Sequence, residues 1–183
     1  MIHAAEDLIL IFNRCFEHEY QTRLEKSPDE PWYLPKSHEH AYHRILFAHG
    51  FFSSALHEIS HWMIAGPQRR LLEDYGYWYE PDGRSIEQQR LFEQVEVKPQ
   101  ALEWILSQAC QYRFQFSLDN LNGETGDTSA FKNAVMAQVK QYCLQGLPQR
   151  AEQFRLALCE FYGTPTALLP DTFLPRISLS YAP

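Results

Sequence analysis

What this chain lacks narrows the classes of protein to which it can belong. None of its apolar runs approaches the ~20 residues that a transmembrane helix needs. Its N-terminus carries no basic leader and no small-residue cleavage site, which argues against a secretory signal. The sequence has no GxSxG elbow, no glycine-rich phosphate loop and no GxGxxG motif. We therefore expect neither a membrane protein, nor a serine-dependent hydrolase, nor a nucleotide-binding enzyme.

Cysteine usage and net charge indicate the compartment and the partners. The four cysteines are scattered and form no CxxC pair: Cys15, Cys110, Cys143 and Cys159. We interpret them as reduced structural thiols of a cytoplasmic protein. The formal net charge is −7, which is unsuited to direct binding of nucleic acid through its phosphates. A negative surface can instead attract a cationic substrate.

The most informative motif that is present is a single HExxH run from His57 to His61. Two imidazoles four residues apart on a helix share one face, so both can bind the same metal ion. Glu58 lies beside the first histidine, where it can exchange a proton with a metal-bound water. The alternative is a structural helix whose histidines are satisfied by ordinary hydrogen bonds. We predict a metal site with His57 and His61 as ligands and Glu58 as a catalytic residue.

A third ligand is expected from a later element, because two histidines alone do not complete such a site. Glu96 is flanked by valines, so its side chain points away from theirs in an extended segment, or lies in the first turn of a helix that begins at Pro99. Glu93 and Glu103 compete with it, and Glu103 could instead be a solvated helix position. Two histidines and one carboxylate with vacant positions suit hydrolytic zinc or oxygen-activating ferrous iron.

The hydrophobic pattern predicts an α+β fold, a helix-rich single domain with a few short strands around the metal-binding helix. At 183 residues and 45% hydrophobic content, the chain can form one globular core. Helical patterns cover residues 4–20, 52–65, 99–116, 128–144 and 148–162, and extended segments are expected at 32–35, 44–49 and 75–79. A loop is expected at 120–128, and an irregular tail at about 164–183 of the 1–183 domain.

Other residues could serve either the site or only the fold. They are His38, His40, His43, His49, Tyr75, Tyr77, Trp78, Tyr79, Asp82 and Arg84. We interpret the first three histidines as part of a solvated loop and His49 as a structural residue at the end of a strand. The aromatic group could wall a pocket or pack in the core. The Pro-Asp-Gly turn that precedes Arg84 forms without any functional requirement, although Asp82 and Arg84 could contact a substrate.

Three ordered blocks of the chain resemble the bacterial elongation factor P hydroxylase family. They are RILFAHGFFSSALHEISHWMIAG at 44–66, GYWYEPDGR at 76–84 and FEQVEVKPQALEW at 92–104. The extended segment at 32–35 is similar too, and the likeness runs from about residue 6 to residue 162. The C-terminal tail matches poorly.

The resemblance implies a metal-dependent, O₂-using hydroxylase that acts on translation elongation factor P, on a lysine already extended with a β-lysyl group. It implies His57, His61 and Glu96 as the ligands of a divalent metal. We expect that metal to be Fe(II), with O₂ as co-substrate, although zinc could occupy the site of the purified protein. Phe52 and Met63 depart from the tyrosine and cysteine that the family leads us to expect, and neither is a proposed ligand.

Two other functions use the same residues. In a zinc hydrolase or peptidase, Glu58 would be the general base on zinc-bound water. In a catalytically silent partner-binding domain, the metal would only stabilise the fold. The expected partner under the first interpretation is elongation factor P, without direct contact to nucleic acid or membrane.

Overall fold

The computed structural model describes residues 3–76, 83–118 and 128–173. Its elements are α1 (Ala5–Tyr20), β1 (Thr22–Ser27), β2 (Trp32–Leu34), β3 (His43–Ala48), α2 (Phe52–Ile64), η1 (Arg69–Leu71), η2 (Glu73–Gly76), α3 (Ile86–Ala109), α4 (Ser129–Gln145), α5 (Gln149–Tyr162) and η3 (Pro170–Phe173). The η segments are short 3₁₀ helices. Five α-helices and one small sheet in the described residues confirm the predicted helix-rich α+β fold.

The sheet has three strands in the order β1-β3-β2. The central strand β3 pairs in parallel with β1 and antiparallel with β2, so that Ile45 lies opposite both Leu24 and Tyr33. β2 and β3 were predicted from their apolar and proline-bounded segments. β1 was not predicted, because Leu24 is its only apolar residue. The sequence signal that could have found it is the alternation of Thr22 and Leu24 with the charged residues Arg23 and Glu25, and the structure buries the first pair.

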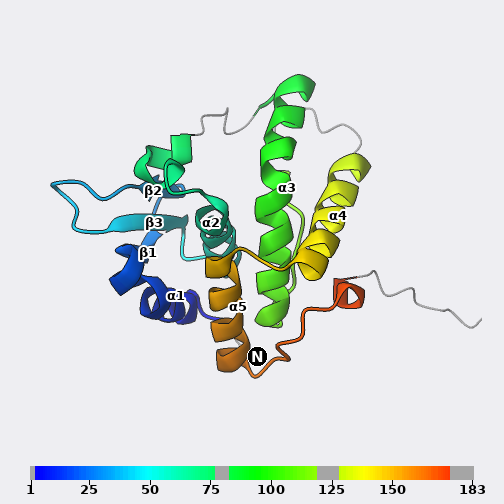
Figure 1. The fold of residues 1–183 in the computed structure, drawn as a ribbon. Helices are drawn as coiled ribbons and strands as arrows, with labels where there is room; N and C mark the ends of the chain where they lie inside the picture. The colour runs from blue at the N-terminus through cyan, green and yellow to red at the C-terminus, as the bar shows by residue number, and fades with distance from the viewer. Residues whose placement is uncertain (1–2, 77–82, 119–127, 174–183) are drawn as a thin grey trace, which may run out of the picture.

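Helix α2 lies between the sheet and α3 (Figure 1). One face of α2 is buried in the core, where Trp62 packs on Phe12 and Phe16 of α1 at ring-centroid distances of 5.2 and 5.0 Å. This packing fixes the rotation of α2 about its own axis. The two histidines of the HExxH run are therefore held on the face that is turned towards α3. None of the helices in the described part of the chain combines the length and the hydrophobicity needed to cross a membrane.

The C-terminal end of α2 is capped by an arginine from α5. Arg150 donates hydrogen bonds to the carbonyls of Trp62, Met63 and Ala65 at 2.9, 3.0 and 2.8 Å. Its guanidinium also lies 4.4 Å from the Trp62 ring centroid. The last carbonyls of a helix have no partner within the helix and carry partial negative charge, so a buried cation there is favourable. Burial lowers the pKa of Arg150 to about 10, which still leaves it charged at neutral pH.

We expect Arg150→Met to lower the free energy of unfolding by about 3 kcal/mol, because the buried carbonyls of Trp62 and Met63 lose the guanidinium donor, whereas the Ala65 carbonyl keeps a hydrogen bond from Arg70. Urea denaturation followed by circular dichroism measures the change. The matched control is Arg155→Met on the same helix, where the guanidinium pairs with Glu152 one turn away. We expect the control to lose less than half as much stability. Equal losses for the two variants would contradict a capping role for Arg150.

Helix α3 differs most from the prediction, which placed its start at Pro99 and its end at residue 116. The helix starts at Ile86, because Ser85 and Gln88 form a capping box. Pro99 lies inside the helix, where its ring removes one backbone hydrogen bond without ending the helix. Glu96 is therefore in the middle of a 24-residue helix, and the prediction of a strand or a first helical turn for it is wrong.

The predicted strand at 75–79 is also wrong where the structure describes it. Tyr75 and Gly76 belong to η2, and residues 77–79 lie outside the described ranges. α1, α2, α4 and α5 are confirmed with small shifts of their ends. The predicted irregular tail contains one short element, η3, which buries Phe173.

Candidate metal centre

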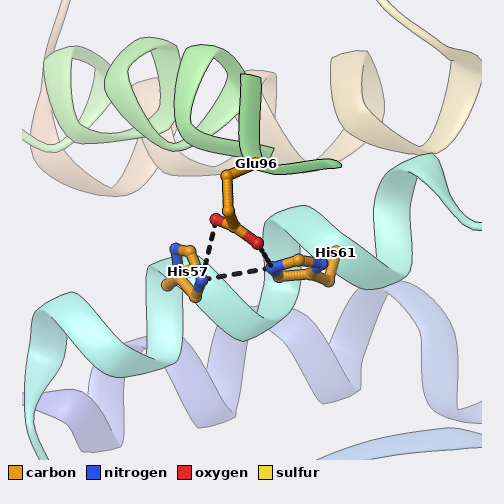
Figure 2. Close-up of side chains that lie close together, drawn as sticks. All are labelled: His57, His61 and Glu96. Atoms are coloured by element: carbon orange, nitrogen blue, oxygen red, sulfur yellow. Dashed lines mark hydrogen bonds and ion pairs between the residues drawn. The ribbon is translucent and has the colours of Figure 1, made fainter. Parts of the chain in front are cut away.

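Helices α2 and α3 bring together the three residues predicted as ligands. Figure 2 shows the side chains of His57, His61 and Glu96 pointing towards one another from the two helices. Glu96 Oε1 lies 3.1 Å from His61 Nε2, and Glu96 Oε2 lies 3.5 Å from His57 Nε2. The two Nε2 atoms are 3.1 Å apart. Ligand atoms that each bind one ion at about 2.1 Å lie about 3.0–3.4 Å from each other, so these separations fit a shared divalent metal.

The electrostatics of the cluster also favour a cation. Glu96 is 1% exposed, and burial works to raise its pKa, but the charges of His61 and His57 outweigh burial and lower it to about 2. Burial works to lower the pKa of His57, but Glu96 and Glu103 outweigh it and raise it to about 10. The buried carboxylate is thus ionised at neutral pH and is stabilised mainly by positive charge beside it, with a hydrogen bond from the Gln100 amide at 3.4 Å. A divalent ion can supply that charge in place of the imidazole protons.

Glu103 is not a solvated residue, and it contacts the far ring nitrogen of His57 instead of joining the three proposed ligands. It is 7% exposed, and its Oε2 accepts a hydrogen bond from His57 Nδ1 at 2.9 Å. This bond leaves His57 Nε2 free to face His61 and Glu96. Metal-binding histidines commonly donate their other ring nitrogen to such a carboxylate, which fixes the tautomer and the ring orientation. The spacing of seven residues between Glu96 and Glu103, two helical turns, is the signal that could have placed both on this face.

Glu93 and Glu58, the other glutamates considered from the sequence, differ in their position relative to the cluster. Glu93 is half-buried and accepts a hydrogen bond from Gln89 at 3.3 Å, one turn away from the cluster. Glu58 is half-buried beside His57. Burial raises the pKa of the Glu58 carboxyl, and the nearby charges of His57 and His61 act in the opposite direction. Glu58 is therefore within electrostatic reach of both imidazoles, as the HExxH pattern predicts.

The other residues singled out in the sequence lie away from this cluster or in the fold. His49 is exposed after β3, with its ring 5.7 Å from Phe51. His38 and His40 lie in the connection before β3, whereas His43 is half-buried within β3 and accepts a hydrogen bond from the Lys36 backbone at 3.0 Å. The solvated-loop interpretation is therefore wrong for His43.

Arg84 is part of the packing around the start of α3. It is buried, donates to Gln89 Oε1 at 2.9 Å and to the Leu118 carbonyl at 3.1 Å, and stacks over the Phe92 ring at 3.8 Å. These contacts support a structural role. Tyr77 and Asp82, which were considered with it, lie outside the described residues.

Comparison with known proteins gives a consistent result. A family model described as "Elongation factor P hydroxylase" matches residues 11–173. The chain is 63% identical over 164 residues to a protein of Haemophilus influenzae (strain ATCC 51907 / DSM 11121 / KW20 / Rd) named "Elongation factor P lysine hydroxylase". That match covers 90% of this chain and 92% of the relative. The family match spans α2 and α3, and hence the whole cluster of His57, His61 and Glu96.

Proposed function

Because this chain belongs to the elongation factor P hydroxylase family, we propose that it hydroxylates a lysine of translation elongation factor P at the cluster of His57, His61 and Glu96. The observation that carries the assignment of the site is the convergence of two imidazole nitrogens and one buried carboxylate within 3.5 Å of one another. The enzyme is accordingly a protein-lysine hydroxylase. The zinc hydrolase suggested by HExxH alone has no support from the relatives.

The metal we propose is Fe(II). Two histidines and one carboxylate are the donor set of non-haem iron oxygenases, and they leave positions open for other ligands. When bound, iron would supply the activation of O₂, which the side chains of the protein cannot provide. Zinc accepts the same donors, so zinc in the purified protein would be compatible with this site.

The protein side of the reaction follows from the residues around the cluster. Glu103 holds the His57 ring with Nε2 directed at the site. Glu58 would hold or pass a proton at the carboxyl group beside His57. The protein would bind the substrate with one C–H bond directed at the cluster of His57, His61 and Glu96, so that placement determines which carbon reacts.

The substrate we propose is the lysine of elongation factor P after its extension with a β-lysyl group. That side chain is cationic, and the net charge of −7 on this chain favours its approach. We propose that the enzyme acts in the cytoplasm, together with its substrate, and that it contacts neither nucleic acid nor membrane directly.

The test is the intact mass of β-lysylated elongation factor P after aerobic incubation with the iron-loaded protein and a chemical reductant. We expect a gain of one oxygen atom, lost without O₂ and lost with His57→Ala. The same incubation with zinc in place of iron and without O₂ distinguishes the two functions, because a zinc hydrolase would still act under those conditions and the hydroxylase would not. If the substrate gained no mass although iron occupancy was confirmed, the proposed function would be contradicted.

A further inference from the structure

The segment that leads into Tyr75 has an unfavourable backbone. Asp74 and Tyr75 have φ values of 44° and 59°, in the left-handed region that residues with a Cβ atom rarely adopt. Neighbouring groups hold the segment in place. Asp74 Oδ1 accepts the Tyr33 backbone N–H at 2.8 Å, and Arg69 donates to the Tyr75 carbonyl at 3.0 Å. Such conformations persist where the surroundings enforce them, often at functional sites.

The conformation inserts the Tyr75 ring between the sheet and the candidate metal centre. The ring is stacked on Tyr33 of β2, with centroids 4.2 Å apart and planes 17° apart. The ring is also nearly parallel to the imidazole of His61, with centroids 6.4 Å apart and planes 11° apart. Tyr75 is 5% exposed, so this stack is a buried arrangement. The strained turn thus supports an aromatic ring against one of the proposed ligands.

The hydroxyl of Tyr75 is the second unusual feature. It is buried and has no hydrogen-bond partner in the described structure. Buried polar groups are almost always paired, so an unpaired one requires an explanation. A phenol O–H can donate a hydrogen bond, so this hydroxyl is available to a group that enters the site.

We propose that Tyr75 completes the metal site in two ways. Its ring keeps the imidazole of His61 in the orientation that directs Nε2 at Glu96, and its hydroxyl would donate a hydrogen bond to a small molecule bound beside His61. The proposal rests on the proposed function, because it takes His57, His61 and Glu96 to be metal ligands. It accounts for the strained turn, the stacked rings and the unpaired hydroxyl together.

The experiment uses the full chain loaded with Co(II), whose visible absorption reports binding of azide as a probe of the open position. We expect Tyr75→Phe to retain the Co(II) affinity of the unchanged protein and to weaken azide binding about tenfold, the effect of one lost hydrogen bond. We expect Tyr75→Leu, which also removes the ring, to weaken Co(II) binding by about tenfold or more, as loss of a group that orients a ligand does.

The chain offers a matched control in Tyr162 of α5. Its hydroxyl is also buried without a partner, at 6% exposure of the residue. Removing either hydroxyl should raise the melting temperature of the metal-free protein by about 2–4 °C, because an unpaired buried polar group is lost. Only Tyr75→Phe should weaken azide binding.

Each outcome decides a separate claim. Equal azide affinities of Tyr75→Phe and Tyr162→Phe would overturn the role of the hydroxyl. Unchanged Co(II) affinity of Tyr75→Leu would overturn the role of the ring. If the unchanged protein binds Co(II) no better than His57→Ala does, the metal site of the proposed function fails first, and the role of Tyr75 fails with it.

Discussion

Replacement of Glu96 by glutamine is expected to lower oxygen transfer to elongation factor P by about 100-fold or more. The substitution keeps the shape of the side chain but removes the only carboxylate, among the residues that the structure describes, that lies within 3.5 Å of both ligand nitrogens. Residues that merely orient ligands typically change affinity or activity 10- to 100-fold, so loss of a ligand charge should cost at least as much. The measurements are the rate of mass gain of the substrate and the iron content of the variant after dialysis.

The matched control for this prediction is Glu93→Gln, on the same helix one turn earlier. Glu93 competes with Glu96 on sequence grounds, but its contact is the hydrogen bond from Gln89. We expect its activity and iron content to stay within about twofold of the unchanged protein, as for a substitution that touches no ligand. If Glu93→Gln lost activity and Glu96→Gln kept it, the proposed ligand set would be wrong.

The second large effect is expected at Glu103. Glu103→Ala should weaken metal binding by about 10- to 100-fold, because the His57 ring loses the partner of its Nδ1–H and the negative charge that increases its basicity. Glu103→Gln should weaken binding less, since the amide oxygen can still accept the same hydrogen bond. Competition with a coloured chelator measures both affinities.

A graded result is the informative feature of this pair of variants. An ordering in which alanine is worst and glutamine intermediate is expected from a partner that both orients and polarises His57. Equal affinities of Glu103→Ala and the unchanged protein would show that Glu103 contributes only to packing. Thermal unfolding of the metal-free variants serves as the control, because it reports any loss of folded structure separately from loss of metal.

The fold could be predicted where a local signal determines the structure. The apolar period of α1, α2, α4 and α5, and the glycine and proline after α2, depend on neighbours in sequence, and those elements were correctly predicted. The predicted start of α3 is wrong because Pro99, a residue type typical of a first helical turn, lies inside this helix, and the capping box of Ser85 and Gln88 starts it. β1 was missed because a strand at the side of a small sheet needs few apolar residues.

The sequence blocks predicted the family more securely than the hydrophobic period predicted the ends of the helices. The blocks around the HExxH run and around Glu96 were sufficient to predict the family, and the family match over residues 11–173 confirms it. The same blocks carry the ligand set only as an implication of the resemblance. The spacing itself left Glu93, Glu96 and Glu103 as alternatives.

The sequence by itself determined that His57 and His61 share one face of a helix, because four residues on a helix always return to nearly the same side. Only the tertiary structure decided which glutamate joins them and which one supports them. That choice depends on the rotation and height at which α3 packs against α2, set by side chains spread over the whole core. Tyr75 lies near His61 for another tertiary reason, because η2 packs on β2, a strand distant from it in the sequence.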